Sequence, residues 1–128
     1  MKILIIDDEP FMLSSLKDLI VGLGYHCETA NNGKRAFELL KNKSSFDAII
    51  CDFNMPEMTG LELRLKLRDE FDSCPPFILL SGDISQVKDD EHRQLFYSLL
   101  QKPGGVNLLR DKLREIEGFS NYPISKSS

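Results

Sequence analysis

The stretch ILIIDDEP, residues 3–10, decides the fold of this chain and points to its site. Its four apolar residues are followed at once by Asp7 and Asp8, and a second, largely apolar run, residues 46–51, is followed by Asp52. Such runs are typical of parallel strands that are covered on both faces. Ligands of an open parallel sheet bind beyond the carboxyl ends of the strands, where the strand order reverses, so we expect the three aspartates to share one crevice.

Three carboxylates in one crevice repel one another. Their pKa values rise unless a cation lies among them, because each charge disfavours the ionised form of its neighbours. A bound metal ion inverts that effect. The sequence therefore anticipates a divalent metal ion beside Asp7, Asp8 and Asp52.

The composition indicates one globular domain. The chain has 128 residues, of which 41% are hydrophobic and 28% charged, and it is too short for a second folded unit. A net charge of -4, with an isoelectric point near 5.2, argues against a surface for nucleic acid. No apolar stretch approaches the about 20 residues of a membrane span, and the N-terminal residues lack a signal-peptide cleavage site. We expect a cytoplasmic protein without a nucleic-acid or membrane partner.

The cysteines and phenylalanines are expected to be structural. Cys27, Cys51 and Cys74 are odd in number and have no C-x-x-C spacing, which favours three reduced, mostly buried thiols over disulfides or a zinc site. Four phenylalanines are expected in the core or at strand edges and not in a stacking platform: Phe11, Phe37, Phe46 and Phe77.

Short apolar runs alternate along the chain with stretches whose apolar residues recur at helical spacing. The predicted strands cover residues 2–7, 25–30, 46–52, 77–81 and 97–101. Parallel neighbours need crossovers of about a dozen or more residues, which are nearly always helical and right-handed. The sequence therefore predicts five β/α units.

The first helix has the clearest signals. Asp8 is the expected N-cap, Pro10 lies in the first turn, and Gly24 marks the end. Between them, apolar residues at positions 12, 16, 19 and 23 form a stripe that is expected to pack on the sheet. Two further amphipathic helices are expected from residues 33 and 109.

The leucines alternate strictly in LELRLKL, residues 61–67, and this period alone would favour a strand. We predict a helix, because Leu, Glu, Arg and Lys are strong helix formers and a crossover is needed here. On this helix Leu63 and Leu67 face the sheet. Leu61 and Leu65 point partly elsewhere and, where exposed, would add a small contact surface.

Two other segments have weak patterns. Residues 84–96 are polar with little apolar period, so their helix is expected to be short or mobile. Residues 118–128 contain Pro, Ser and Asn without a pattern and are expected to be frayed or to begin a linker. The predicted domain accordingly covers residues 1–117.

Polar residues lie at the ends of four predicted strands, in this order: Asp7-Asp8, Asp52, Ser81-Gly82 and Lys102-Pro103. The run D-x-N-M-P-x-x-x-G, residues 52–60, belongs to the same pattern. With these motifs the chain resembles the receiver domain of two-component response regulators, over roughly residues 1–117. The resemblance implies an α/β, flavodoxin-like three-layer α/β/α sandwich with a five-stranded parallel sheet of order 2-1-3-4-5.

The resemblance assigns the central role to Asp52. A carboxylate can attack phosphorus and hold the phosphoryl group as an acyl phosphate, and the implied donor is a phosphohistidine. The implied cofactor is Mg²⁺: Asp8 and Asp52 bind it directly, Asn54 offers its main-chain carbonyl, and Asp7 holds a coordinated water. The ion would offset repulsion between the phosphate and the acids and align the attack.

The resemblance also assigns the phosphoryl contacts. Lys102 supplies a fixed positive charge for one phosphoryl oxygen, and the hydroxyl of Ser81 donates to another. Backbone amides of Phe53 and Gly82 are expected to complete the cradle. If the family pattern holds, the Lys102-Pro103 peptide bond is cis, which would aim the lysine into the crevice.

The chain departs from the family pattern beside the lysine. Receivers usually carry Tyr or Phe three residues before it, an aromatic ring that turns inward when the serine or threonine moves toward phosphate. Here that residue is Leu99, so the switch is expected to be altered. Tyr97, two residues earlier, would point to the same face if both lie on a strand. Gly104 and Gly105 stand where an apolar residue is common.

Asn54 and Asp83 each lie two positions beyond a site residue, on the expected path of water to the acyl phosphate. Polar groups there can orient the attacking water. We therefore expect a phosphorylated form that lasts minutes rather than hours, and slower decay when Asp83 is replaced by an apolar residue.

Other interpretations fit less well. A phosphatase of the haloacid dehalogenase type also uses an aspartate and magnesium, but it carries D-x-D where residues 7–10 read DDEP. A flavin module needs a phosphate-binding loop rich in Ser, Thr and Gly, which is missing here. A degenerate receiver, used only as a protein-binding scaffold, is the closest alternative, although every charged and hydroxyl group of the site is present. Single motifs have simpler explanations, since Asp7-Asp8 alone is typical of a helix cap.

The sequence thus predicts a phosphorylation-dependent switch of a two-component system. We expect no turnover of a free substrate, only a module that assists its own phosphorylation and dephosphorylation. The expected partners are a sensor histidine kinase or phosphotransfer protein, and a downstream effector or a C-terminal output domain outside these residues. A homodimer is compatible with the sequence.

Overall fold

The computed structural model describes residues 1–42 and 45–121, and in them strands and helices alternate. The strands are β1 (Lys2–Ile6), β2 (His26–Ala30), β3 (Ala48–Asp52), β4 (Phe77–Ser81) and β5 (Ser98–Gln101). The α-helices are α1 (Pro10–Gly22), α2 (Gly33–Asn42), α3 (Gly60–Glu70), α4 (Asp90–Arg93) and α5 (Leu109–Asn121). Short 3-10 helices, η1 (Ile84–Gln86) and η2 (Gly104–Leu108), precede α4 and α5.

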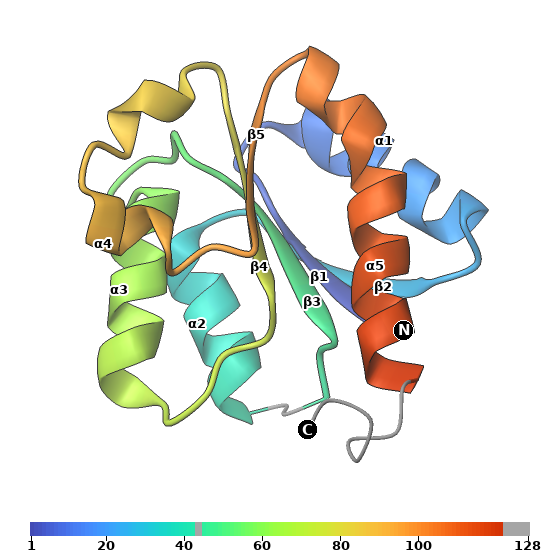
Figure 1. Cartoon of the computed structure of the whole chain (residues 1–128), viewed down its shortest axis with the longest axis horizontal. Helices are drawn as coiled ribbons and strands as arrows, with labels where there is room; N and C mark the ends of the chain where they lie inside the picture. Colours follow the sequence, from blue (N-terminus) through green and yellow to red (C-terminus); the bar gives the residue numbers. More distant parts are fainter. Residues whose placement is uncertain (43–44, 122–128) are drawn as a thin grey trace.

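The strands form one parallel sheet in the order β2-β1-β3-β4-β5. Helices α1 and α5 cover one face, and α2, α3 and α4 lie on the other (Figure 1). The register pairs Asp52 with Leu80 of β4, so β3 ends one residue before the end of β4. The predicted α/β/α sandwich and its strand order are confirmed.

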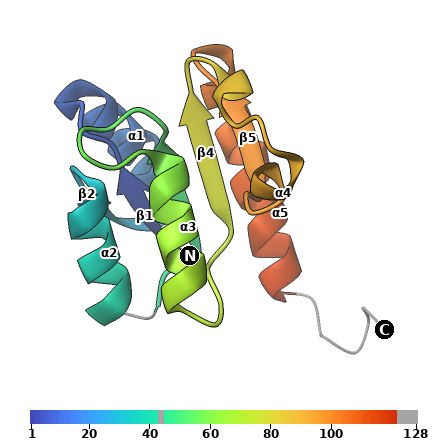
Figure 2. The same ribbon diagram turned by 90° about the vertical axis from the view of Figure 1, so that its left-hand side faces the viewer.

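The buried apolar side chains of the strands enter one of two cores. In β1, Ile3 and Ile5 face the core under α1 and α5, whereas Leu4 and Ile6 face the core under α2 and α3. Figure 2 looks onto the face of the sheet that α2 and α3 cover, whereas Figure 1 shows the helix layers on the two sides of the sheet. Burial of one such side chain contributes about 1.5–3 kcal/mol, so continuous apolar runs fix the central strands between the helices.

The N-cap of helix α1 lies one residue later than expected. Its N-cap is Glu9, whose side chain accepts a hydrogen bond from the N–H of Phe11, and not Asp8. The reason is that the helix starts at Pro10, so Asp8 lies outside the capping position. The helix ends before Gly24, which has a φ of 91°, a conformation that favours glycine. Asp8 is therefore not used as a cap.

Helix α3 confirms the choice of helix for residues 61–67. Thr59 and Glu62 form a reciprocal capping box at its start, which satisfies two backbone donors. Leu63 and Leu67 are buried against the sheet, as predicted. The alternating leucines that point elsewhere, at positions 61 and 65, are half-buried.

The two weakly patterned segments differ in outcome. The segment after β4 contains only the single turn of η1 and the four residues of α4, as expected for a short helix. Residues 118–128 are expected to be frayed or to begin a linker, but helix α5 continues to Asn121. The expectation is therefore wrong for residues 118–121. The apolar residues of α5, Leu109, Leu113 and Ile116, bury one face, and the helix continues past the last of them. Residues 122–128 of the expected frayed tail lie outside the described residues.

Two aromatic predictions are wrong. Phe11 is 85% exposed, because it lies on the same face of α1 as the exposed Ser15 and turns away from the sheet. Tyr97 does not share a face with Leu99: it packs on the side of α5 and its hydroxyl donates to Glu115 (2.8 Å). Tyr97 precedes β5, so strand alternation does not apply to it.

The cysteines are free thiols, with Cys51 buried and Cys27 and Cys74 half-buried. Burial raises the pKa of all three, which keeps them protonated. Across the described ranges, we find no helix with the length and apolar content needed to cross a bilayer.

Candidate functional site

An open crevice of about 820 Å³ lies at the carboxyl ends of the strands. Asp7 directly follows β1, Asp52 is the last residue of β3, and Lys102 directly follows β5. All three line the crevice, together with Asp8, Asn54 and the first turn of α1. The fold therefore brings these sequence-predicted residues together, because the carboxyl ends of parallel strands meet at one edge.

The three carboxylates form a tight cluster. One oxygen from each of Asp7, Asp8 and Asp52 lies within 4.8 Å of the other two. Asp7 is 1% exposed and Asp52 7%, whereas Asp8 is open to solvent. Two acids thus form the floor of the crevice, and the third stands at its entrance.

Lys102 balances part of this negative charge. Its Nζ lies 2.7 Å from Oδ1 of Asp52 and 3.8 Å from Oδ2 of Asp7. Its backbone N–H donates to the carbonyl of Ser81 (2.7 Å), which joins the loop after β5 to the end of β4. The Lys102-Pro103 bond is cis, as the resemblance predicts.

The charge of Asp7 is only partly compensated. Burial raises the pKa of Asp7, and the neighbouring Asp52 adds to this, while the N–H of Glu9 on Oδ1 (2.9 Å) opposes it. The other oxygen, Oδ2, is buried without a hydrogen-bond partner. A buried carboxylate oxygen without a donor is unfavourable, so this atom needs a cation or a bound water.

These donors suit a magnesium ion. Mg²⁺ takes hard oxygen ligands and retains several waters, and the cluster offers carboxylate oxygens of Asp8 and Asp52 beside the unsatisfied Oδ2 of Asp7. The open side leaves room for waters and for a phosphoryl oxygen. The residues therefore fit the ion that the sequence anticipates.

Two of the groups predicted to contact the phosphoryl oxygens, the hydroxyl of Ser81 and the N–H of Phe53, already have hydrogen-bond partners within the protein. Ser81 is fully buried at the end of β4, and its hydroxyl is already hydrogen-bonded within its own loop. Gly82 is exposed beside it. The N–H of Phe53 donates to the carbonyl of Leu80 (2.8 Å), so it reaches a phosphoryl oxygen only if that bond is released or shared.

The modulating residues also differ from each other. Asn54 is exposed and lines the crevice. Asp83 is exposed two residues beyond the end of β4 and is not among the residues that line the crevice. Its carboxylate accepts hydrogen bonds from the N–H and hydroxyl of Ser85, which lower its pKa. Leu99 packs against the core on the α3 side of β5, at the position where the resemblance implies an aromatic ring.

Gly60 supports the loop that follows Asp52. A Cβ there would lie 2.6 Å from the carbonyl oxygen of Asp52 and 2.6 Å from Cδ1 of Leu79. Real Cβ atoms essentially never approach so closely, so only glycine allows α3 to start this near the end of β3. The last residue of the D-x-N-M-P-x-x-x-G run is thereby explained.

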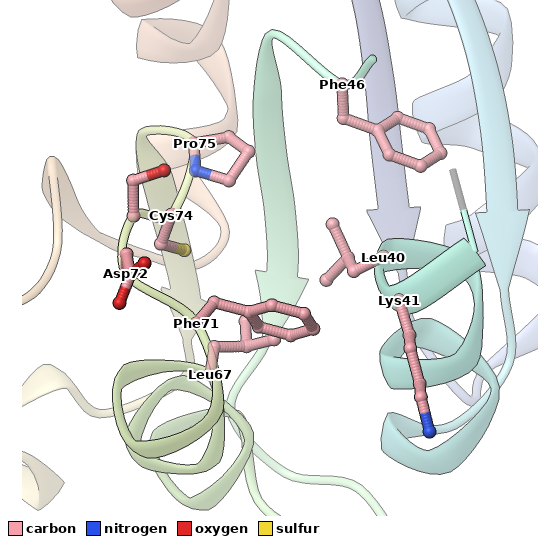
Figure 3. Close-up of a pocket in the computed structure, with 9 residues that line it drawn as sticks. Leu40, Lys41, Phe46, Leu67, Phe71, Asp72, Cys74 and Pro75 are labelled. Carbon is pink, nitrogen blue, oxygen red and sulfur yellow. The ribbon is translucent and has the colours of Figure 1, made fainter. Parts of the chain in front are cut away.

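A second cavity, of about 490 Å³, lies between α2, α3 and the loop before β4. Figure 3 shows Leu40 and Phe71 extending toward each other across it, while Lys41 points away. Phe46, Leu67 and Cys74 complete a mainly apolar wall. It contains no carboxylate cluster among the described residues, so its chemistry differs from that of the crevice.

Sequence reasoning missed one polar neighbour of the site. Gln86, the last residue of η1, accepts a hydrogen bond from the hydroxyl of Ser81 (3.1 Å). Its spacing from Ser81 matches neither a strand nor a helix. The contact depends on the path of the loop between them, and no local pattern reveals it.

Comparison with known proteins agrees with this geometry. Residues 3–114 match the model of the response regulator receiver domain family. The chain is 32% identical over 113 residues, 88% of its length, to the sensor histidine kinase RcsC of Salmonella typhimurium, of which it covers 12%. It is 39% identical to the two-component response regulator ARR10 of Arabidopsis thaliana, covering 100% of this chain and 23% of that protein.

Solved structures give the same result. The response regulator TrrA of Thermotoga maritima, in complex with Mg²⁺-BeF, superimposes with a TM-score of 0.79 at 28% identity, covering 90% of this chain and 97% of that one. TrrA is also solved in complex with the histidine kinase ThkA, and this match has a TM-score of 0.73 at 29% identity, covering 90% and 97%. The chain belongs to the response regulator receiver domain family, and its function lies in two-component signalling.

Proposed function

We propose that Asp52 accepts a phosphoryl group from a phosphohistidine, with Mg²⁺ as cofactor. The observation that carries this proposal is the contact of 2.7 Å between Lys102 Nζ and Asp52 Oδ1, inside a cluster of three carboxylates. An oxygen of Asp52 forms the new bond to phosphorus as the bond to the donor's imidazole nitrogen breaks. The bonding electrons stay on that nitrogen.

We assign the metal ligands residue by residue. Asp8 and Asp52 would bind Mg²⁺ through carboxylate oxygens, Asn54 through its main-chain carbonyl, and Asp7 through a coordinated water. The bound ion supplies charge neutralisation for the phosphoryl oxygens. Asp8 is free for this role because Glu9, and not Asp8, caps α1.

Lys102, Ser81 and Gly82 form the rest of our proposed phosphoryl site. Lys102 is ion-paired with the acceptor carboxylate and would keep its charge on a phosphoryl oxygen after transfer. The hydroxyl of Ser81 and the N–H of Gly82 would each donate to another oxygen. We keep Phe53 as a further donor, on condition that its bond to Leu80 opens.

The partners follow from the chemistry and the relatives. A phosphohistidine donor is found on a sensor histidine kinase or a phosphotransfer protein, and TrrA is seen with the kinase ThkA. Because the chain covers only 12% of RcsC and 23% of ARR10, the output can lie in an attached segment as well as in a separate effector. We propose that the receiver domain of residues 1–117, extended to the end of α5, acts in the cytoplasm. It turns over no free substrate.

Intact mass measurement tests the proposal. The protein is incubated with Mg²⁺ and acetyl phosphate, a small phosphoryl donor, beside Asp52→Asn. With Mg²⁺ we expect one added phosphoryl group on the wild type and none on Asp52→Asn. When EDTA replaces Mg²⁺, we expect none on the wild type either. Equal modification of both proteins, or no modification of the wild type with Mg²⁺, would contradict it.

A further inference from the structure

The hydroxyl of Ser81 is held away from the crevice in this structure. Its Oγ lies 3.0 Å from the carbonyl oxygen of Asp83 and 3.1 Å from Oε1 of Gln86, and it accepts from the N–H of Asp83. The hydroxyl has one proton, so the two acceptors share it. Both contacts must open before Ser81 can donate to a phosphoryl oxygen.

Gln86 is the only side chain among these partners. Gln86 is the last residue of η1. Two hydrogen bonds fix the backbone of this turn: the N–H of Ser85 donates to the side chain of Asp83, and the N–H of Val87 donates to the carbonyl of Ile84. A side-chain contact from the end of η1 to the end of β4 therefore ties the position of the whole turn to the state of Ser81.

Arginine links extend this connection to α4. Nη1 of Arg93, in α4, donates to the carbonyl of Ile84 (3.1 Å) and to that of Val87 (2.8 Å), on both sides of Gln86. Arg64 of α3 holds the far end of α4 through the carbonyl of Leu95 (2.9 Å). A helix of four residues has little stability of its own, so these bonds determine where α4 lies.

Residue 99, where the resemblance implies an aromatic ring, is a leucine. Leu99 is half-buried and aliphatic, and Tyr97 is bonded to Glu115 of α5 on the other face of the sheet. Among the described contacts, the polar connection from Ser81 through Gln86 to Arg93 leads from the crevice to α4.

We propose that Gln86 is a positioning residue that holds Ser81 in the resting state, and that phosphorylation of Asp52 breaks this contact and releases η1 and α4. This inference rests on the proposed phosphorylation of Asp52. Removal of a contact that exists only in the resting state favours the other state. Loss of the Gln86 acceptor should therefore strengthen the binding of a phosphoryl group.

Beryllofluoride, a tetrahedral anion that binds a carboxylate oxygen, is the probe. The full chain is titrated with it at saturating Mg²⁺ and followed by amide NMR. Gln86→Met, which keeps the side-chain length without the acceptor, should lower the Kd about three- to tenfold, the effect of one neutral hydrogen bond. The exposed Gln94→Met, at the end of α4, is the matched control and should stay within about twofold of the wild type.

A double-mutant cycle shows whether Gln86 acts through Ser81. In a Ser81→Ala background, Gln86→Met should change the Kd by less than about twofold, because its partner is gone. In the free Gln86→Met protein, the amide signals of residues 84–93 should also move toward their positions in the beryllofluoride-bound wild type. An unchanged or raised Kd for Gln86→Met, or the same decrease without Ser81, overturns the inference.

The same titration separates this inference from the proposed function. If Asp52→Asn binds beryllofluoride as the wild type does, or if the wild type does not bind it, phosphorylation of Asp52 is refuted and the role of Gln86 falls with it. If only the wild type binds and Gln86→Met behaves like Gln94→Met, the role of Gln86 alone is refuted.

Discussion

The two halves of the sheet edge hold their polar groups in different ways. In the half formed by β1 and β3, Asp7 and Asp52 stand directly at the strand ends, and Lys102 pairs with both. In the half formed by β4 and β5, Ser81 depends on a single-turn helix for its hydrogen bonds. We call the first the acceptor half, after the proposed role of Asp52. Both β3 and β4 are buried strands, but the hydroxyl of Ser81 is held by polar contacts of the loop that follows β4.

This difference indicates a division of work. Buried apolar strands keep the acids and the lysine in place with or without a phosphoryl group. The segment after β4 has few buried residues and short helices, so it is the part that can change position at low free-energy cost. If both proposals hold, the chemistry and the response are separated along one edge of the sheet.

The largest effect is expected for Lys102, the lysine that follows β5 and pairs with the acids of the acceptor half. Lys102→Met removes the only positive charge within ion-pair distance of Asp52 among the described residues. We expect phosphorylation by acetyl phosphate to slow about 100-fold, as when one charged donor is lost from an active site. Intact mass over time gives the rate, with the exposed Lys34→Met as control. A rate within about threefold of the wild type would show that Lys102 does not supply the positive charge that the transfer needs.

The next effect tests the rigidity of the acceptor half. Gly60→Ala would drive a Cβ into the carbonyl of Asp52 and the side chain of Leu79. We expect the free energy of unfolding to fall by about 1–3 kcal/mol, the range for overpacking, in urea denaturation. Gly22→Ala, at the end of α1 with no atom within 4 Å of its Cβ, is the control and should not destabilise. Equal stability of both variants would show that the β3–α3 loop adjusts easily.

A smaller effect concerns the uncompensated charge. Asp7→Asn should raise the free energy of unfolding in EDTA at neutral pH, because burial raises the pKa of Asp7 and the folded protein therefore disfavours its charged form. Added Mg²⁺ should stabilise the wild type more than the variant, since the ion binds only the folded protein.

The same pair of proteins gives a pH test. A pKa raised by folding means that the folded state binds the proton more tightly, so this stabilisation is present at low pH and is lost as the pH rises through the folded pKa of Asp7. The gap between Asp7→Asn and the wild type should therefore shrink as the pH falls. A gap that grows in acid would mean that the charged form is favoured; Asp18→Asn, exposed on α1, is the control.

The smallest effect compares the two water-orienting candidates, one on each half. Replacing Asn54 by Ala should slow decay of the acyl phosphate about threefold, the effect of one lost hydrogen bond to water. Asp83→Leu should also slow it, by less, because the Asp83 carboxylate is occupied by Ser85. Decay of the added mass after removal of acetyl phosphate gives both rates. Unchanged decay in Asp83→Leu would refute its role in dephosphorylation.

The acceptor half was predictable because its information is local. Buried runs ending in Asp7 and Asp52 define strands and place their acids at one edge without any knowledge of the remaining contacts. The order of the strands followed from the resemblance, and LELRLKL was recognised as a helix from propensity and the need for a crossover.

The errors lie where geometry between elements decides. Asp8 is not the cap, because the start of α1 is set by Pro10 and Glu9. Phe11 faces solvent because its helix face, and not its type, determines its burial. Tyr97 turns to α5 because β5 begins one residue later, and Gln86 reaches Ser81 through a loop whose path no periodicity describes. Such contacts depend on how separate elements pack together.

A crystal structure of the chain with Mg²⁺ and beryllofluoride tests the central claim most directly. It should show the ion on carboxylate oxygens of Asp8 and Asp52, beryllofluoride on a carboxylate oxygen of Asp52, and Lys102 within hydrogen-bond distance of a fluorine. Beryllofluoride bound to another residue, an ion away from the three aspartates, or Lys102 turned to solvent would contradict the account.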